Sequence, residues 1–203
     1  MPRLGTLRRS IVVVAIALAG GVLVGSVIAA QRGGDSGPDV ARLQAAIAAE
    51  PMTRVADVAG GEGSSARGVY VQELDTGHLC VWDAPSTASR ERQGGCNSTD
   101  EPLGGSAVSA NLAYDGGPAI EGVRDARLTG LAASGVASVV VLMSDGSERT
   151  VHLKQARLKA GDFLAFGYRF KKADLRKGVG PIAVLARDAD GGEIARQSTG
   201  IGG

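Results

Sequence analysis

Residues 11–30, IVVVAIALAGGVLVGSVIAA, hold no charged residue and only one polar side chain. A helix of about twenty residues is about 30 Å long, which is the thickness of the hydrocarbon core of a bilayer. The arginines that precede the run are Arg3, Arg8 and Arg9. Because positive flanks stay on the cytoplasmic side, the run predicts a single-pass membrane protein with residues 1–10 inside and the C-terminal part outside the cell membrane.

The length of this run bears on whether the segment is retained or removed. Secretory signals usually have an apolar core of about 7–15 residues, so the longer run favours a retained anchor. Val27 and Ala29 also fit the −3 and −1 positions of a cleavage site. The alternative is therefore secretion after cleavage near Ala29.

Small side chains recur at every fourth position of the run, at Ala17, Gly21, Gly25 and Ala29. Such a ridge would allow two membrane helices to approach closely, which makes a helix-mediated dimer one of two interpretations. The alternative is chance, since glycine is abundant throughout the chain, with 31 residues.

Cys80 and Cys96 are the only cysteines in the chain. A pair on the exported side of a membrane predicts one disulfide, which closes a loop of about 15 residues and contributes roughly 3 kcal/mol in the loop-entropy treatment. His78 lies two residues before Cys80, so a thiol nucleophile or a metal site is an alternative. The other histidine, His152, has no metal-like spacing to these residues, and we expect no metal and no cofactor.

Residues 31–67 read as a linker that contains one short helix, at about 38–50. Pro38 suits the first turn of this helix, and Pro51 ends it. Val40, Leu43 and Ile47 fall on one side. The helix is expected to lie on the membrane-proximal side of the folded domain or to extend the stalk.

From residue 68 to residue 203 the chain shows short β segments separated by glycine and aspartate. Roughly eight strands with regular turn signals predict an antiparallel, immunoglobulin-like β-sandwich. Asp145-Gly146 marks the clearest hairpin, with an expected two-residue turn. Alternation places Leu164, Phe166, Tyr168 and Phe170 on one strand face, which is expected to pack inward.

The charge and the aromatic content of the chain limit the classes of molecule that it can be expected to bind. The formal net charge is +1, and there are one Trp, three Tyr and three Phe, too few for the stacking platforms of single-strand nucleic-acid binding. Residues 149–177 carry nine lysines and arginines against Asp162 and Asp174. This basic stretch indicates either an ordinary solvated surface or a site for an anionic wall polymer.

No catalytic motif stands out. The sequence has no Gly-x-Ser-x-Gly element, and neither histidine has a recognisable catalytic context. The run from Asp188 to Glu193, DADGGE, has the acidic spacing of part of a calcium loop, but it lacks the later ligands and is expected to be a turn.

Several turn and strand signals between residues 123 and 194 resemble a group of exported proteins of high-GC Gram-positive bacteria for which no activity is established. The matching residues are Gly130, Leu131, Gly135, Val136, Ser138, Val139, Asp145, Gly146, Arg187, Asp188, Ala189 and Gly191. The hairpin with Cys80 and the second cysteine after a polar loop add to the likeness. The resemblance implies a fold and transfers no catalytic residues.

The sequence therefore predicts a membrane-anchored extracytoplasmic β-sandwich with a non-enzymatic interaction or structural role at the cell envelope. Its expected partners are the membrane itself, through residues 11–30, and an envelope protein or wall polymer. One alternative is a sensor or regulatory subunit of a membrane complex. The other is a secreted hydrolase of unfamiliar type, which would need His78, His152 and a carboxylate close together.

Overall fold

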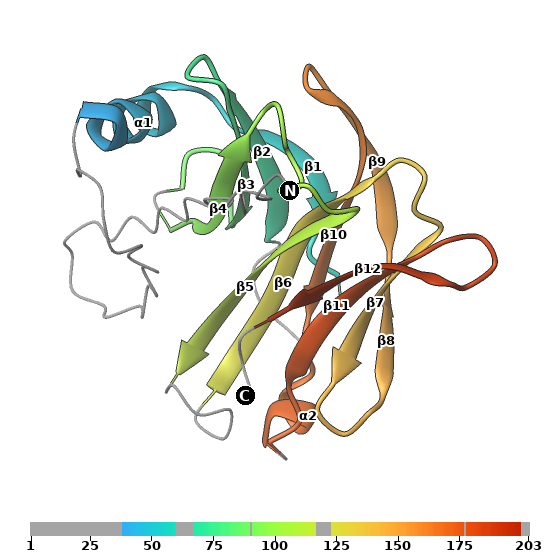
Figure 1. Cartoon of the computed structure of the whole chain (residues 1–203). Coiled ribbons are helices and arrows are strands. Elements are labelled where there is room, and N and C mark those ends of the chain that lie inside the picture. The colour runs from blue at the N-terminus through green and yellow to red at the C-terminus, as the bar shows by residue number, and fades with distance from the viewer. Residues whose placement is uncertain (1–37, 60–66, 90, 117–122, 177, 200–203) are drawn as a thin grey trace, which may run out of the picture.

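Strands β1 to β12 form three antiparallel sheets of four strands each in the computed structural model. The sheets are stacked, and helix α1 (Pro38–Ala49) covers the open face of the first (Figure 1). The layers therefore follow the order helix, sheet, sheet, sheet. The described residues are 38–59, 67–89, 91–116, 123–176 and 178–199.

The three sheets are numbered in the order in which the chain enters them. The first sheet has the order β1 (Thr53–Asp57), β2 (Gly68–Leu74), β3 (His78–Ala84), β4 (Gln93–Ser98). The second sheet has the order β5 (Val108–Gly116), β6 (Val123–Ala133), β10 (Gly161–Arg169), β9 (Leu153–Leu158). The third sheet has the order β12 (Glu193–Ser198), β11 (Pro181–Arg187), β7 (Ser138–Met143), β8 (Glu148–Val151). A short helix, α2 (Lys172–Arg176), lies between β10 and β11.

The middle sheet is buried on both faces because strand residues alternate between them. On β10, Phe166 is fully buried in the core shared with the third sheet, and Leu164 and Tyr168 pack against the same core. Phe170, just after the strand, is buried there too, which confirms the inward-facing alternation. Phe163 faces the opposite way, into the core shared with the first sheet.

Three hairpins share one loop geometry. The amide of Gly77 donates to the Leu74 carbonyl, and the amide of Gly146 donates to the Met143 carbonyl. Gly191 donates to Asp188 in the same way, and the three glycines have φ angles of 76°, 78° and 83°. This is a three-residue loop in which glycine takes the left-handed position. The expected two-residue turn at Asp145-Gly146 is therefore one residue longer.

The described residues after α1 differ from the expected linker. Strand β1 occupies Thr53–Asp57, and the side chains of Met52 and Ala56 are buried. The strand pairs with β2, and Ala59 forms a bridge to Tyr168 on β10. Pairing with a distant strand, and not a local pattern, therefore orders this segment.

The described residues also form one sheet more than the two of the expected sandwich. One sandwich was predicted from residue 68 onward, whereas β2, β3 and β4 join β1 in a separate sheet. Apolar residues on β2 and β3, such as Val69 and Leu79, pack on the outer face of the second sheet. The physical reason is that the middle sheet has a second apolar face to cover.

The predicted membrane segment, residues 11–30, lies outside the described residues, and so do Ala17, Gly21, Gly25 and Ala29. None of the helices in the described part of the chain has the length and apolar character that crossing a bilayer requires. The anchor and the helix dimer stay predictions.

Candidate functional site

The two cysteines form the predicted disulfide. Cys80 on β3 and Cys96 on β4 lie directly opposite each other in the antiparallel ladder, and their sulfur atoms are bonded at 2.06 Å. Both side chains are buried, with 0% and 5% of their surface exposed. The bond therefore joins an edge strand of the first sheet to its neighbour, beneath the layer formed by α1.

Helix α1 covers the face of the first sheet that carries the disulfide. Leu43 and Ile47, one turn apart, are buried, as predicted from their spacing, while Val40 is half-buried. A helix of this length is marginal alone in water, so its packing on the sheet stabilises it. The buried cluster that these two residues join contains Met52, Tyr70, Leu74, Cys80, Trp82, Ala84 and Cys96.

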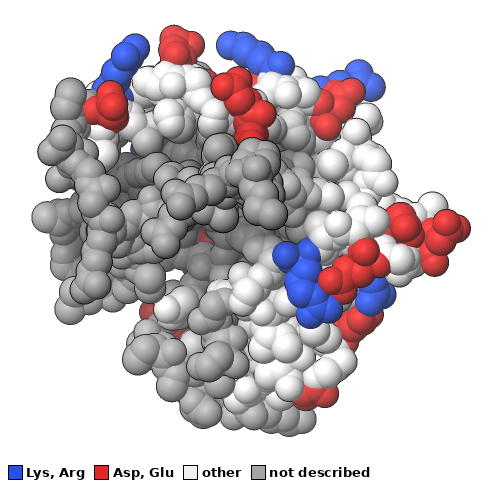
Figure 2. All heavy atoms as spheres, in the orientation of Figure 1, with Lys and Arg blue, Asp and Glu red and all other residues white. Residues whose placement is uncertain are grey.

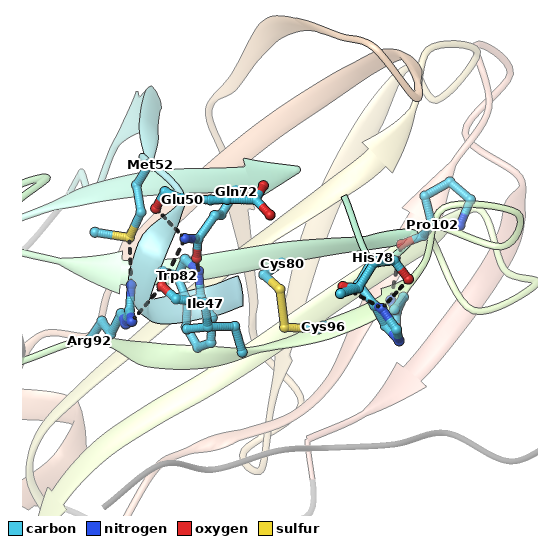
Figure 3. The surroundings of a disulfide bond; sticks show 12 residues. Ile47, Glu50, Met52, Gln72, His78, Cys80, Trp82, Arg92, Cys96 and Pro102 are labelled. Atoms are coloured by element: carbon cyan, nitrogen blue, oxygen red, sulfur yellow. Dashed lines mark hydrogen bonds between the residues drawn. A yellow bond between two sulfur atoms is a disulfide. The ribbon is translucent and has the colours of Figure 1, made fainter. Parts of the chain in front are cut away.

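A buried glutamine binds the C-terminal end of α1. Gln72 on β2 is fully buried, and its Nε2 donates to the Ile47 carbonyl at 2.9 Å and to the Glu50 carbonyl. Trp82 Nε1 on β3 donates to Gln72 Oε1 at 3.1 Å (Figure 3). The last carbonyls of a helix have no partner within the helix. Gln72 satisfies two carbonyls at this end with one amide, and Trp82 holds that amide in place.

Arg92, just before β4, completes this contact. Its Nη2 donates to the Ile47 carbonyl at 3.0 Å, and its guanidinium lies 5.2 Å from the centre of the Trp82 ring. Its Nη1 also contacts the Met52 sulfur (Figure 3). Burial lowers the pKa of Arg92, yet a guanidinium stays protonated in proteins. A cation at the C-terminal end of a helix is favourable, so charge adds to the attachment.

We call Gln72, Trp82, Arg92 and the disulfide the helix dock. Sequence reasoning found the disulfide and missed the other three residues. Gln72 is the polar residue within the apolar run GVYVQEL, which is a signal that it has a buried partner. Arg92 lies in a polar stretch that resembles an ordinary surface loop, and nothing local distinguishes it.

A second buried cluster joins the first sheet to the second. Asp83 on β3 is fully buried and accepts from Arg67 Nε at 2.8 Å and from Arg127 Nε at 2.7 Å. Arg127 also pairs with Asp125, which accepts from Arg169 Nε at 2.8 Å. The ion pairs run from β3 through β6 to β10. Removal of one partner from such a pair leaves an uncompensated buried charge, so the cluster links the two sheets energetically.

The two histidines are not brought together. His78 begins β3, and its Nδ1 lies 3.1 Å from the Thr76 carbonyl. His152 lies between β8 and β9, where the chain passes from the third sheet to the second, and is exposed. Within the described ranges, no aspartate or glutamate side chain hydrogen-bonds either ring. The set of groups that the hydrolase alternative needs is not assembled from these residues.

The acidic run after β11 is a turn, as expected. The Asp188 carboxylate accepts from the amides of Asp190 and Gly192, at 3.0 and 2.7 Å, which is ordinary turn chemistry for aspartate. Among the residues that the structure describes, no group of three or more His, Cys, Asp or Glu side chains is placed to hold a metal ion.

Charged side chains of both signs are interspersed on the face drawn in Figure 2. On the third sheet, Arg187 forms an ion pair with Glu148, and Arg196 forms one with Glu193. Arg196 holds the pKa of the Glu193 carboxyl below its usual value. This part of the surface therefore carries its charges mainly as neutralised pairs.

Comparisons of the chain with protein families, with curated proteins and with solved structures gave no match.

Proposed function

We propose that the chain is a membrane-anchored, extracytoplasmic β-sandwich module with a non-enzymatic interaction or structural role at the cell envelope. The observation that carries the proposal is the helix dock. Helix α1 follows the predicted span after only residues 31–37, and Gln72 and Arg92 bind its C-terminal end to the first sheet.

The length of this connection limits how far the folded part can move from the membrane. Seven residues span at most about 25 Å when fully extended, at 3.3–3.6 Å each. With α1 bound to the sheet instead of extending a stalk, the β region is held close to the bilayer. Such an attachment suits a module that meets other components at the membrane surface.

The disulfide supports the proposed extracytoplasmic location of the β region. Disulfides persist in oxidising compartments and are rare in the cytosol. The predicted orientation, with residues 1–10 inside, places Cys80 and Cys96 outside.

We propose further that the second and third sheets form an immunoglobulin-like sandwich. If β5 to β12 are labelled A, B, C, C′, D, E, F and G in chain order, the sheets read A-B-E-D and G-F-C-C′. This is the strand order of the immunoglobulin class. The first sheet and α1 then form an added unit on its A-B-E-D face, toward the N-terminus.

The test is to express the full chain with a C-terminal tag and to follow its location and thiols. We expect the tagged chain to stay in the membrane after an alkaline wash, to be digested by protease added outside, and to react with alkylating reagents only after reduction. The double variant Leu18→Arg/Leu23→Arg should lose membrane retention, and Leu18→Ile/Leu23→Ile should keep it. Recovery of a chain shortened near Ala29 in the medium would contradict the anchor. Free thiols before reduction would contradict the orientation.

The interaction role is tested by crosslinking the tagged full chain in intact cells and identifying the products. Reproducible crosslinks to one or a few envelope components are expected. A chain that gives no crosslinks beyond those of an unrelated anchored control would contradict that role and would leave the location result standing.

A further inference from the structure

The edge strands of the three sheets differ in how far other parts of the chain bond to them. Gln197 on β12 bonds both backbone groups of Ala110 on β5, so these two edges are held together. Asn97 on β4 donates to the Ser109 hydroxyl on β5. Ala59, just after β1, exchanges backbone hydrogen bonds with β10. Side-chain and backbone contacts therefore occupy part of each of these edges.

Strands β8 and β9 form a different kind of edge. β8 ends the third sheet and β9 ends the second, and His152 alone separates them in the chain. In the described part of the chain, no strand pairs with the outer side of either one. Residues 148–158 therefore form one edge that passes from sheet to sheet, with backbone groups available to another strand.

A groove of about 380 Å³ lies at the point where this edge changes sheets. Val151 and Leu153 give it apolar walls, while Ser138, Thr150 and His152 add two hydroxyl groups and an imidazole. Its size is in the lower part of the range of ligand pockets. A groove of this kind next to an open strand edge can hold a side chain of an added strand.

The β8–β9 edge carries an excess of positive charge. Lys154, Arg157 and Lys159 are exposed, and none of them has a carboxylate within ion-pair distance in the described residues. Glu148, the acid on β8, is already paired with Arg187. Asp162 on β10 lies opposite Arg157, and the Glu73 carboxylate accepts from the Ala160 amide next to Lys159. Lys154, Arg157 and Lys159 still outnumber these two acids.

We propose that the β8–β9 edge binds an extended acidic peptide segment of another protein, which adds to β9 as a strand and places one side chain in the groove. This inference rests on the interaction role proposed above. Lysine on an edge strand normally discourages pairing with other strands. Lys154 and Arg157, which alternation places on opposite faces of β9, repel a basic strand and favour an acidic one, so the same side chains provide specificity.

The experiment uses the full chain in nanodiscs and a synthetic decapeptide that alternates glutamate and valine. Binding should be saturable, and it should weaken as salt is raised. Lys154→Glu/Arg157→Glu should weaken it at least tenfold. Lys171→Glu/Lys172→Glu, the same change of net charge at exposed positions after β10, should leave it unchanged.

A second peptide separates strand addition from simple charge attraction. The same decapeptide with N-methyl groups at alternate residues keeps its charge and loses half of its backbone donors, and it should not bind. Equal binding of the two peptides, or equal loss in both charge variants, would overturn the proposal. Inorganic polyphosphate serves as a competitor. If it displaces the peptide completely and binds both charge variants with equal affinity, the proposal is overturned in favour of a general polyanion-binding surface. Loss of peptide binding in a chain that still localises and crosslinks as expected overturns this inference alone.

Discussion

Gln197 on β12 bonds the backbone of Ala110 on β5 through both ends of its side-chain amide. Nε2 donates to the Ala110 carbonyl, and the Ala110 amide donates to Oε1, each at 2.8 Å. The Gln197 amide thus bonds backbone groups of β5 that a neighbouring strand could otherwise bond. Strands β5 and β12 belong to different sheets and do not pair with each other. The Gln197 side chain joins the two sheets on this side, while on the opposite side the chain itself passes from β8 to β9 and the outer edges of both strands stay unpaired.

Replacing this glutamine by leucine should weaken this link between the two sheets. In Gln197→Leu both backbone groups of Ala110 lose their partner, and unfolding free energy should fall by about 1–3 kcal/mol. Urea denaturation measures the change. Ser198→Ala, at the exposed next residue of β12, should stay within about 0.5 kcal/mol of the parent. Equal stability of the two variants would show that water replaces the amide at no cost.

The helix dock makes a local prediction. Gln72→Leu keeps the size of the side chain and leaves the Ile47 and Glu50 carbonyls without this donor, so it should cost about 1–3 kcal/mol. The loss should appear first in α1, as faster amide exchange and proteolysis at residues 38–49. Gln155→Leu, an exposed glutamine on β9, is the matched control and should leave α1 protected. Unchanged exchange in the Gln72 variant would contradict the dock.

Helix α1 shields the disulfide from solvent. Cys80 and Cys96 are buried beneath α1, so a water-soluble phosphine should reduce them slowly in the folded chain and quickly in denaturant. The Gln72→Leu variant should be reduced faster than the parent without denaturant, because α1 opens more often. Mass measurement after alkylation follows the reaction. Equal rates in parent and variant would show that α1 does not control access to the sulfur atoms.

Local patterns in the sequence were enough to predict most strands. The alternation through Phe166 and Tyr168 was confirmed, and the turn glycines marked the hairpins correctly because only glycine accepts that backbone conformation cheaply. Strand β1 was missed. Only Ala56 of its five residues is buried, so TRVAD carries no alternating apolar signal.

The three-sheet arrangement depends on contacts between distant residues. Asp83 is bound by Arg127, 44 positions away, and Gln72 by Ile47, 25 positions away. No local spacing encodes such pairs. The candidate site was therefore found only in part: the disulfide followed from cysteine count, whereas the residues that bind α1 appear in the sequence as single polar residues without a visible partner.

The shared hairpin loop predicts how glycine replacements should differ. Gly146 has φ +78°, and an added Cβ would meet no atom within 4 Å, so Gly146→Ala tests backbone strain alone. It should cost about 1–2 kcal/mol. Gly135→Ala also meets open space, but without a positive φ, and it should be neutral or stabilising by about 0.4–1 kcal/mol. Thermal denaturation of the two variants compares them directly, and similar shifts would contradict the assigned loop geometry.

The ion pairs between the first two sheets give the largest expected loss. Asp83→Ala leaves Arg67 and Arg127 buried or half-buried without their shared carboxylate, and this should cost about 3–5 kcal/mol. Asp57→Ala removes an exposed pair with Arg54 and should cost about 0–1 kcal/mol. The double variant Asp83→Ala/Arg127→Met should be more stable than Asp83→Ala, because it removes a buried cation that has lost one of its two carboxylates, while Asp125 keeps Arg169. If the losses in the double variant simply add, the two residues do not interact, and this ion pair does not help to hold the two sheets together.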